Sequence, residues 1–398
     1  MSMRYKGGFI QTWFNPLSSG VGWKQYSGAW TLQAQMQAKA AGLWTLQGIN
    51  LWSWGQNAYG QLGQSNVIYR SSPVQVGALT TWSKISAGRY SCLATKTDGT
   101  LWSWGYNGQG QLGQSDVIPR SSPVQVGALT TWLNISVGLY SSLATKTDGT
   151  LWSWGLNNQG QLGDNTIINR SSPVQIGALT TWLNISAGYQ SCLATKTDGT
   201  LWSWGYNAYG QLGQNNIVNK SSPTQVGALT TWLNISSGNY SCLATKTDGT
   251  LWSWGYNAQG QLGLNDVINR SSPVQVGALT TWLNVSVGAL SCLATKTDGT
   301  LWSWGVNNTG QLGQNDIVYR SSPVQVGALT TWSKVSVGRY SCLATKADGT
   351  LWSWGYNAYG QLGQNNIVNK SSPVQVGALT TWLNISAGAN TSLATQSY

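Results

Sequence analysis

Short stretches in which apolar and polar residues alternate recur from residue 51 onward. In the first unit they are LWSWG at 51–55, PVQV at 73–76, ISAG at 85–88 and SCLAT at 91–95. Because successive side chains of a strand point to opposite faces of a sheet, each stretch predicts a short β-strand. TDGT at 97–100 is typical of a tight hairpin turn, in which glycine supplies a positive φ. The pattern therefore predicts four strands in every unit.

This unit is repeated almost unchanged with a period of 50 residues. After the first copy at Leu51, further copies begin at Leu101, Leu151, Leu201, Leu251, Leu301 and Leu351. Repetition at this period is typical of solenoids, propellers and arrays. Four short strands per repeat indicate a propeller blade.

The sequence repeats are out of phase with the blades. The repeated region starts with the third and fourth strands of a blade, at 51–76, and ends with the first and second strands, at 385–395. These two halves must pair to complete the last blade, which also removes open strand edges that favour aggregation. We therefore predict an all-β fold in which residues 51–398 form a seven-bladed β-propeller of four-stranded blades, closed by pairing of its N-terminal and C-terminal strands.

Residues 1–50 differ in kind from the repeats. The Ala, Gln, Leu and Met content of 31–41 favours a short helix that ends at Gly42. We predict that residues 1–50 form a separate N-terminal segment that attaches the propeller to another protein or caps it.

The composition argues against catalysis. The chain has no His, and all of its 10 acidic residues are Asp, so neither an imidazole nor a glutamate is present to act as a general base. The five Cys occupy one repeat position, where Ser142 and Ser392 also stand. Exchange with Ser indicates small buried side chains rather than metal ligands or disulfides. We predict a protein that is not an enzyme and that uses no cofactor or metal ion.

The net charge of +11 is distributed with the repeat. One cation stands at the Arg70 position of every copy, and basic residues form no continuous run. A basic balance favours anionic partners, but single cations around a ring favour solvated or locally paired side chains. We therefore expect no nucleic-acid partner. The sequence shows neither a signal peptide nor an apolar stretch of membrane-spanning length, so we expect synthesis in the cytoplasm and no membrane insertion.

The seven copies differ at few positions. Variation falls on position 56, on 58–59, on 64–69, on 89–90 and on their equivalents, whereas 77–82 and 97–100 barely change. In an up-and-down blade the variable segments lie on one face, named here the top face, and the constant segments lie on the opposite bottom face. Variable loops on a constant scaffold commonly carry binding specificity, although neutral drift in exposed loops also produces variation. Tyr and Asn recur among the variable residues, as they do in binding paratopes.

These considerations define a predicted partner-binding set on the top face. Its members are Gln56, Tyr59, Arg89, Tyr90, Tyr106, Tyr140, Tyr189, Gln190, Tyr206, Tyr209, Asn239, Tyr240, Tyr256, Arg339, Tyr340, Tyr356 and Tyr359.

The repeats resemble those of the regulator of chromosome condensation family. The residues that carry the resemblance in the first unit are Trp52–Gly55, Asn57, Gly60–Gly63, Pro73, Gly88, Ser91–Ala94 and Asp98–Gly99, and they recur over 51–398. The family's usual His before the Ser is absent, and Tyr90 stands there in the first copy. The resemblance implies a seven-bladed propeller. It also implies three alternative functions: guanine-nucleotide exchange, chromatin binding, or inhibition of an enzyme by capping its active site.

The N-terminal segment resembles the opening of virion proteins of marine phages. The matching residues are Met3–Gly8, Gly28–Leu32, Gln33–Gly42 and Trp44. The resemblance implies attachment to other virion proteins through residues 1–50, to which we assign Arg4, Tyr5, Trp30, Leu32 and Met36. The main functional prediction is therefore a non-enzymatic phage virion structural protein, in the tail or on the particle surface. Its top face would bind a host-surface protein or glycan, and its N-terminal segment would support a homotrimer.

Overall fold

The computed structural model describes residues 48–398. Within it, Ile49 to Ser397 form one compact unit that is built from β-strands. No helix that could cross a membrane is found in this part of the chain. The helix predicted for 31–41 and the five predicted attachment residues lie outside the described residues.

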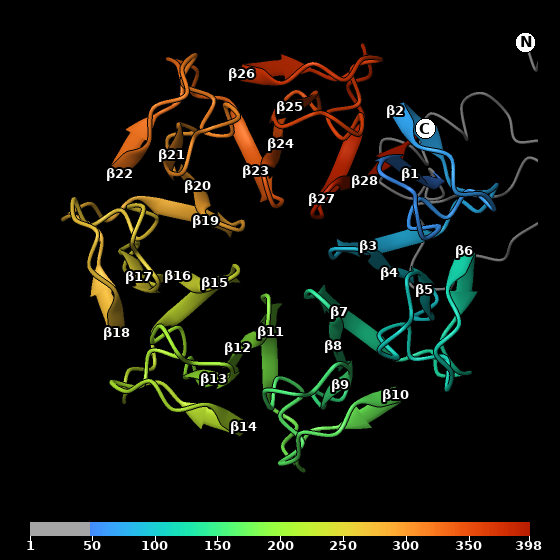
Figure 1. Cartoon of the computed structure of the whole chain (residues 1–398), viewed down its shortest axis with the longest axis horizontal. Coiled ribbons are helices and arrows are strands. Elements are labelled where there is room, and N and C mark those ends of the chain that lie inside the picture. Colours follow the sequence, from blue (N-terminus) through green and yellow to red (C-terminus); the bar gives the residue numbers. More distant parts are fainter. Residues whose placement is uncertain (1–47) are drawn as a thin grey trace, which may run out of the picture. The chain divides into compact units, whose positions relative to one another are not determined.

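Seven antiparallel sheets of four strands each are arranged as blades around a central axis (Figure 1). The inner strands and the turns that follow them line a central channel with a cavity at each end. This arrangement confirms the predicted all-β, seven-bladed propeller. From the channel outward, the blades contain the following strands: blade 1, β3 (Trp82–Ala87), β4 (Ser91–Lys96), β5 (Leu101–Gly105) and β6 (Arg120–Gln125); blade 2, β7 (Trp132–Val137), β8 (Ser141–Lys146), β9 (Leu151–Gly155) and β10 (Arg170–Gln175); blade 3, β11 (Trp182–Ala187), β12 (Ser191–Lys196), β13 (Leu201–Gly205) and β14 (Lys220–Gln225); blade 4, β15 (Trp232–Ser237), β16 (Ser241–Lys246), β17 (Leu251–Gly255) and β18 (Arg270–Gln275); blade 5, β19 (Trp282–Val287), β20 (Ser291–Lys296), β21 (Leu301–Gly305) and β22 (Arg320–Gln325); blade 6, β23 (Trp332–Val337), β24 (Ser341–Lys346), β25 (Leu351–Gly355) and β26 (Lys370–Gln375); blade 7, β27 (Trp382–Ala387), β28 (Thr391–Ser397), β1 (Ile49–Gly55) and β2 (Arg70–Gln75).

Blade 7 is built from both ends of the propeller sequence. β28 pairs with β1 in an unbroken antiparallel register that runs from Ile49↔Ser397 to Gly55↔Thr391. The sheet order is β2-β1-β28-β27. The predicted closure is therefore confirmed, and the edges of β1 and β28 are paired rather than open.

The outer and inner strands differ in extent from the prediction. The outer strand of blade 7 begins at Arg70 rather than at Pro73, because its ladder with β1 includes a pair between Gly55 and Arg70. The register of this ladder is irregular, and Pro73 lies on the edge strand, where its missing N–H is tolerated. The inner strand of blade 1 begins at Trp82 rather than at residue 85.

A tryptophan from each third strand fills the space between neighbouring blades. Trp104 of β5 is 0% exposed, and its Nε1 donates a 2.9 Å hydrogen bond to the carbonyl oxygen of Gln61 in blade 7. Its ring packs edge-on against Trp82, with ring centroids 6.2 Å apart. The loop of blade 7 approaches so closely that a Cβ on Gly63, whose φ is +68°, would lie 3.1 Å from Trp104 Nε1. The loop after each third strand is therefore fixed by the next blade.

The constant residues of the bottom face form a local network. Asp98 accepts hydrogen bonds from the Thr100 hydroxyl at 2.7 Å and the Thr100 backbone N–H at 2.9 Å. The side-chain hydrogen bond and then the backbone bond hold the pKa of Asp98 below its ordinary value. Thr100 Oγ1 also accepts from Trp102 Nε1 at 2.9 Å, and the Lys96 ammonium lies 3.6 Å from the centroid of a Trp102 ring. These contacts explain why the residues of the bottom face are nearly identical in the copies.

Candidate interaction surface

Backbone hydrogen bonds place the variable segments on one face. The N–H of Tyr106, directly after the third strand, donates to the carbonyl oxygen of Tyr90 in the turn between the first two strands, at 2.9 Å. On the other face, the N–H of Thr97 donates to the carbonyl oxygen of Thr81 at 2.8 Å. The turns at 88–90 and the loops at 56–69 therefore share the top face, and the constant segments share the bottom face.

The first tyrosine cluster joins blades 7, 1 and 2, and it consists of Tyr59, Tyr90, Tyr106 and Tyr140. The Tyr59 ring lies 5.1 Å from Tyr90 and 5.0 Å from Tyr106, edge-on in both cases. Tyr106 and Tyr140 are 5.9 Å apart between ring centroids. Pairs of this kind contribute about 0.5–1.5 kcal/mol each beyond the area that they bury. Burial raises the pKa of Tyr140, and the four side chains remain partly or largely exposed.

The second tyrosine cluster joins blades 3 and 4, and it consists of Tyr189, Tyr206, Tyr209, Tyr240 and Tyr256. Tyr209 of blade 3 lies 5.1 Å from Tyr240 and 5.0 Å from Tyr256 of blade 4. Tyr189 lies 5.5 Å from Tyr240, and Tyr206 lies 6.2 Å from it. Tyr240 is thus at the centre of the cluster, and burial raises its pKa.

The third tyrosine cluster joins blades 6 and 7, and it contains one residue that the sequence reasoning missed. Tyr356 lies 6.3 Å from Tyr340 and 6.1 Å from Tyr359. Tyr359 in turn lies 5.8 Å from Tyr69 of blade 7, which was not in the predicted set. Tyr69 belongs to the variable loop 56–69, and this was the signal that could have identified it.

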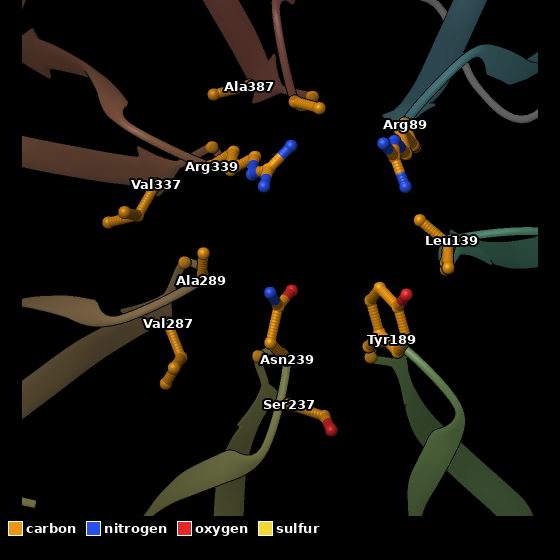
Figure 2. Close-up of a pocket in the computed structure, with 18 of the residues that line it drawn as sticks. Arg89, Leu139, Tyr189, Ser237, Asn239, Val287, Ala289, Val337, Arg339 and Ala387 are labelled. Atoms are coloured by element: carbon orange, nitrogen blue, oxygen red, sulfur yellow. The ribbon is translucent and has the colours of Figure 1, made fainter. Parts of the chain in front are cut away.

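The residues after Gly88 and its equivalents surround the top mouth of the channel. They are Arg89, Leu139, Tyr189, Asn239, Ala289, Arg339 and Ala389, and they line a cavity of about 380 Å³. Figure 2 shows Arg89 and Arg339 directed into this cavity from two blades. Each guanidinium lies over the ring of the following tyrosine, at 4.8 Å for Arg89 and 5.0 Å for Arg339. Neither arginine forms an ion pair with a described residue, and no acidic residue lines the cavity.

The two predicted glutamines lie on the same face but outside the tyrosine clusters. Gln56 Oε1 accepts a 3.0 Å hydrogen bond from Asn390 Nδ2 within blade 7. Gln190 Nε2 donates a 3.4 Å bond to Asn158 Oδ1 of blade 2. These amide pairs leave other donors and acceptors accessible, since both glutamines are half-buried.

The cation that recurs at the start of each outer strand is locally paired in four blades. Arg120 Nη2 lies 2.6 Å from Asp116 Oδ2, and the equivalent pairs are Arg170–Asp164, Arg270–Asp266 and Arg320–Asp316. Among the described residues, the remaining three cations of this ring, Arg70, Lys220 and Lys370, form no ion pair. Local pairing, one of the two arrangements predicted, is thus confirmed for these four.

A second exposed surface was not predicted. Two consecutive aliphatic residues near the end of each top-face loop point to solvent, for example Val67 and Ile68, both 58% exposed. Within the same loop, the Asn57 side-chain Nδ2 donates a 3.1 Å hydrogen bond to the carbonyl oxygen of Ile68.

Metal-ligating side chains are scattered rather than clustered in the part of the chain that the structure describes. Within residues 48–398, no three side chains of the metal-ligating types gather. The five Cys thiols are buried and unpaired. Burial raises their pKa, that of Cys242 to about 12. The fold defines a seven-bladed β-propeller built from sequence repeats.

Comparison with known families identifies the repeat type. The sequence matches the family described as the RCC1-like domain over residues 32–290. Regulator of chromosome condensation (RCC1) repeats match at 298–345 and 348–395. The chain therefore belongs to the RCC1-like family. No curated protein matches the sequence.

Solved structures share the fold at low sequence identity. Human WBSCR16 is 21% identical, with a TM-score of 0.79, and the match covers 88% of this chain and 99% of that chain. Prp20p from Saccharomyces cerevisiae, described with its binding properties to Gsp1p and histones, is 19% identical, with a TM-score of 0.80 and coverage of 89% and 92%. Yeast RCC1 (Prp20) bound to Kap60 is 19% identical, with a TM-score of 0.79 and coverage of 88% and 89%. These similarities show a common fold.

Proposed function

We propose that this chain is a non-enzymatic protein-interaction module that binds a partner protein with the top face of its propeller. The observation that supports this function is the grouping of three tyrosine clusters and two unpaired arginines on one face of an otherwise constant scaffold. Tyrosine supplies a large contact area at low cost in conformational entropy. Tyrosine and arginine, together with tryptophan, are enriched in the energetic centres of protein interfaces.

The cationic channel mouth favours a partner with acidic groups. Arg89 and Arg339 enter the cavity without a carboxylate from this chain, so an acidic side chain of a partner would find two guanidinium groups with free donors. A charge-assisted bond of this type is about twice as strong as a neutral one.

The comparisons favour a cellular interaction protein over a virion protein. Both Prp20p structures are described with protein partners, namely Gsp1p and histones in one and Kap60 in the other. The virion function, the virion localisation and the proposed partners of residues 1–50 rest on the N-terminal resemblance alone. Mass spectrometry of purified virions from the source tests that alternative, and absence of the protein from the particles would exclude it.

Photo-crosslinking at the top face tests the proposed interaction. A photoreactive residue at position 90 should capture a defined partner. Replacing Tyr59, Tyr209 and Tyr359 by Gln should reduce capture at least tenfold, because each change removes an aromatic ring from one of the three tyrosine clusters. The fold should tolerate these changes, since Gln already stands at this repeat position in three copies, at Gln109, Gln159 and Gln259. A matched control changes the bottom-face residues Leu179 and Leu229, each 48% exposed, to Ser and should leave capture unchanged. Equal capture by both variants would contradict binding through the top face.

A further inference from the structure

The bottom end of the channel contains a second cavity, of about 440 Å³, with a polar lining. Every inner strand contributes one polar side chain to it, at the second position after the conserved Trp. These residues are Lys84, Asn134, Asn184, Asn234, Asn284, Lys334 and Asn384. The apolar residue that follows each of them completes the lining, which contains no acidic residue.

The asparagine amides form a preorganised ring of donors. Asn134 Nδ2 donates to the carbonyl oxygen of Leu183 at 3.0 Å, and Asn384 Nδ2 donates to that of Ser83 at 3.0 Å. The same bond to the next blade is made by Asn184, Asn234 and Asn284. An amide nitrogen carries two N–H groups, so Asn134, Asn184, Asn234 and Asn384 each keep a second donor after the bond to the neighbouring blade. Asn284 spends its second N–H on Thr295 Oγ1 at 3.1 Å.

Two lysines interrupt this ring and stand on either side of Asn384. The Lys334 ammonium donates to the carbonyl oxygen of Leu383 at 2.7 Å and to Asn384 Oδ1 at 2.9 Å. The Lys84 ammonium has no hydrogen-bond partner among the described residues. Desolvation, and after it the positive charge of Lys84, lowers the pKa of Lys334. The two ammonium groups therefore repel each other without a nearby counter-charge.

The blade architecture accommodates Asn in place of these lysines. Five of the seven blades carry Leu-Asn where blades 1 and 6 carry Ser83-Lys84 and Ser333-Lys334. Asn makes the same bond to the next blade as Lys334 does, and Lys334 adds one further bond, to Asn384 Oδ1. At Lys84 the charge adds repulsion without a hydrogen bond to a described residue. A ligand that supplies negative charge would offset that repulsion.

We propose that the bottom cavity binds an oxyanion of the phosphate or sulfate type between Lys84 and Lys334. A doubly charged oxyanion accepts charge-assisted hydrogen bonds from both ammonium groups. The second N–H of Asn384, which lies between the lysines in the ring, is a further donor. This site lies at the opposite end of the channel from the top face and does not depend on the proposed protein partner.

Isothermal titration calorimetry of the full chain with inorganic phosphate tests the site. The expected result is saturable binding of one ion, with sulfate competing and acetate at equal ionic strength not competing. A parallel titration with a phosphomonoester such as glycerol phosphate distinguishes a free ion from the phosphate group of a larger molecule. Tighter binding of the ester than of inorganic phosphate would show that the cavity holds the phosphate group of a larger molecule.

The decisive variant is Lys84→Asn/Lys334→Asn, which installs the residue already present in five blades. It should weaken phosphate binding at least tenfold while its melting temperature and near-ultraviolet circular dichroism stay close to those of the wild type. The control Lys220→Gln/Lys370→Gln removes the same charge from outer strands and should bind phosphate as the wild type does. Either single lysine variant serves if the double variant fails to fold. Absence of saturable binding, or equal weakening in the control, would overturn the proposal.

Discussion

The pairing of β1 with β28 predicts where the ring opens, and Leu393→Ala is the perturbation that tests it. Leu393 on β28 is 0% exposed and belongs to a cluster with Leu51, Trp82 and Trp104 between blades 7 and 1. Truncation removes three buried carbons, and the hydrophobic transfer free energy lost is about 2.4 kcal/mol at about 0.8 kcal/mol per carbon. It also leaves a cavity. Leu→Ala changes at such sites cost about 2–5 kcal/mol, so we expect a loss of about 3 kcal/mol in unfolding free energy.

Leu143→Ala is the matched control. Leu143 occupies the same position in blade 2, is also 0% exposed and packs in an equivalent cluster with Leu151, Trp182 and Trp204. Both variants should lose the same global stability. The two strand pairs differ in one respect. β8 and β9 are connected by residues 147–150, whereas β28 and β1 are not joined by a turn. Blade 7 can therefore open locally where β28 pairs with β1.

Hydrogen exchange followed by mass spectrometry separates the two effects. A local opening of blade 7 disrupts Leu393 but leaves Leu143 packed, so Leu393→Ala should speed exchange of the β1 and β28 amides about 100-fold, the factor that corresponds to about 3 kcal/mol. Leu143→Ala should leave those amides unchanged. The best protected amides of other blades, which exchange through global unfolding, should accelerate equally in both variants. Equal acceleration of the β1 and β28 amides by both substitutions would refute local opening at this pairing.

Two further predictions follow from single side chains. Cys192→Ser should change the unfolding free energy, measured by chemical denaturation, by less than about 1 kcal/mol. The reason is that the Cys192 thiol donates to the Gln161 carbonyl oxygen at 3.3 Å, and the Ser142 hydroxyl makes the equivalent bond to the Gln111 carbonyl oxygen at 2.9 Å. A loss above about 2 kcal/mol would contradict this equivalence. In acid, the melting temperature should stay level down to about pH 5 and fall below about pH 4. An Asp whose pKa is lower in the folded protein than in the unfolded chain stabilises the folded state at pH values above the ordinary pKa of about 3.9. That contribution is lost as the pH falls through the folded-state pKa. The pKa is lowered, first by the Thr hydroxyl, at Asp98, Asp148, Asp198, Asp248, Asp298 and Asp348. A melting temperature independent of pH between 2 and 5 would contradict the role of these carboxylates.

The architecture could be predicted because each strand carries its own local signal. Alternating segments, one hairpin turn and the period of the repeat are properties of contiguous residues, and the closing blade follows from the phase of the repeat alone. The start of the outer strand at Arg70 could not be predicted in this way, because it depends on an irregular register with β1. Pro73 pointed to an edge strand correctly but not to its first residue.

The sequence predicted which residues belong to the candidate site but not which of them contact one another. Comparing the copies identified the variable residues of the top face, yet the tyrosine clusters form across blade boundaries. They do so because each top-face loop contacts the next blade. In the first loop, for example, the Ser65 N–H donates a 2.8 Å hydrogen bond to the Ser121 carbonyl oxygen of blade 1. Exposed aliphatic residues such as Ile68 escaped prediction for a related reason, since an apolar residue in a sequence suggests burial. Ile68 is 58% exposed in the folded loop.

The four charged residues that line the channel all lie on the two blades that flank blade 7. Arg89 and Lys84 come from blade 1, Arg339 and Lys334 come from blade 6, and no charged side chain from blades 2–5 or 7 lines either cavity. An anion held between Lys84 and Lys334 would therefore bridge blades 1 and 6 across the blade that contains the β1–β28 pairing. If opening of blade 7 separates the lysines, phosphate at ten times its dissociation constant should slow exchange of the β1 and β28 amides about 11-fold.

This coupling links the oxyanion site to closure of the ring, and it has its own control. Phosphate should not change exchange of these amides in Lys84→Asn/Lys334→Asn, and acetate at equal ionic strength should not change it in the wild type. Slowing that persists in the double variant would show that phosphate acts on the whole protein rather than through the two lysines. Saturable phosphate binding without slowed exchange would show that blade 7 opens while blades 1 and 6 stay in place, because the bound ion would then contact the closed and open states equally.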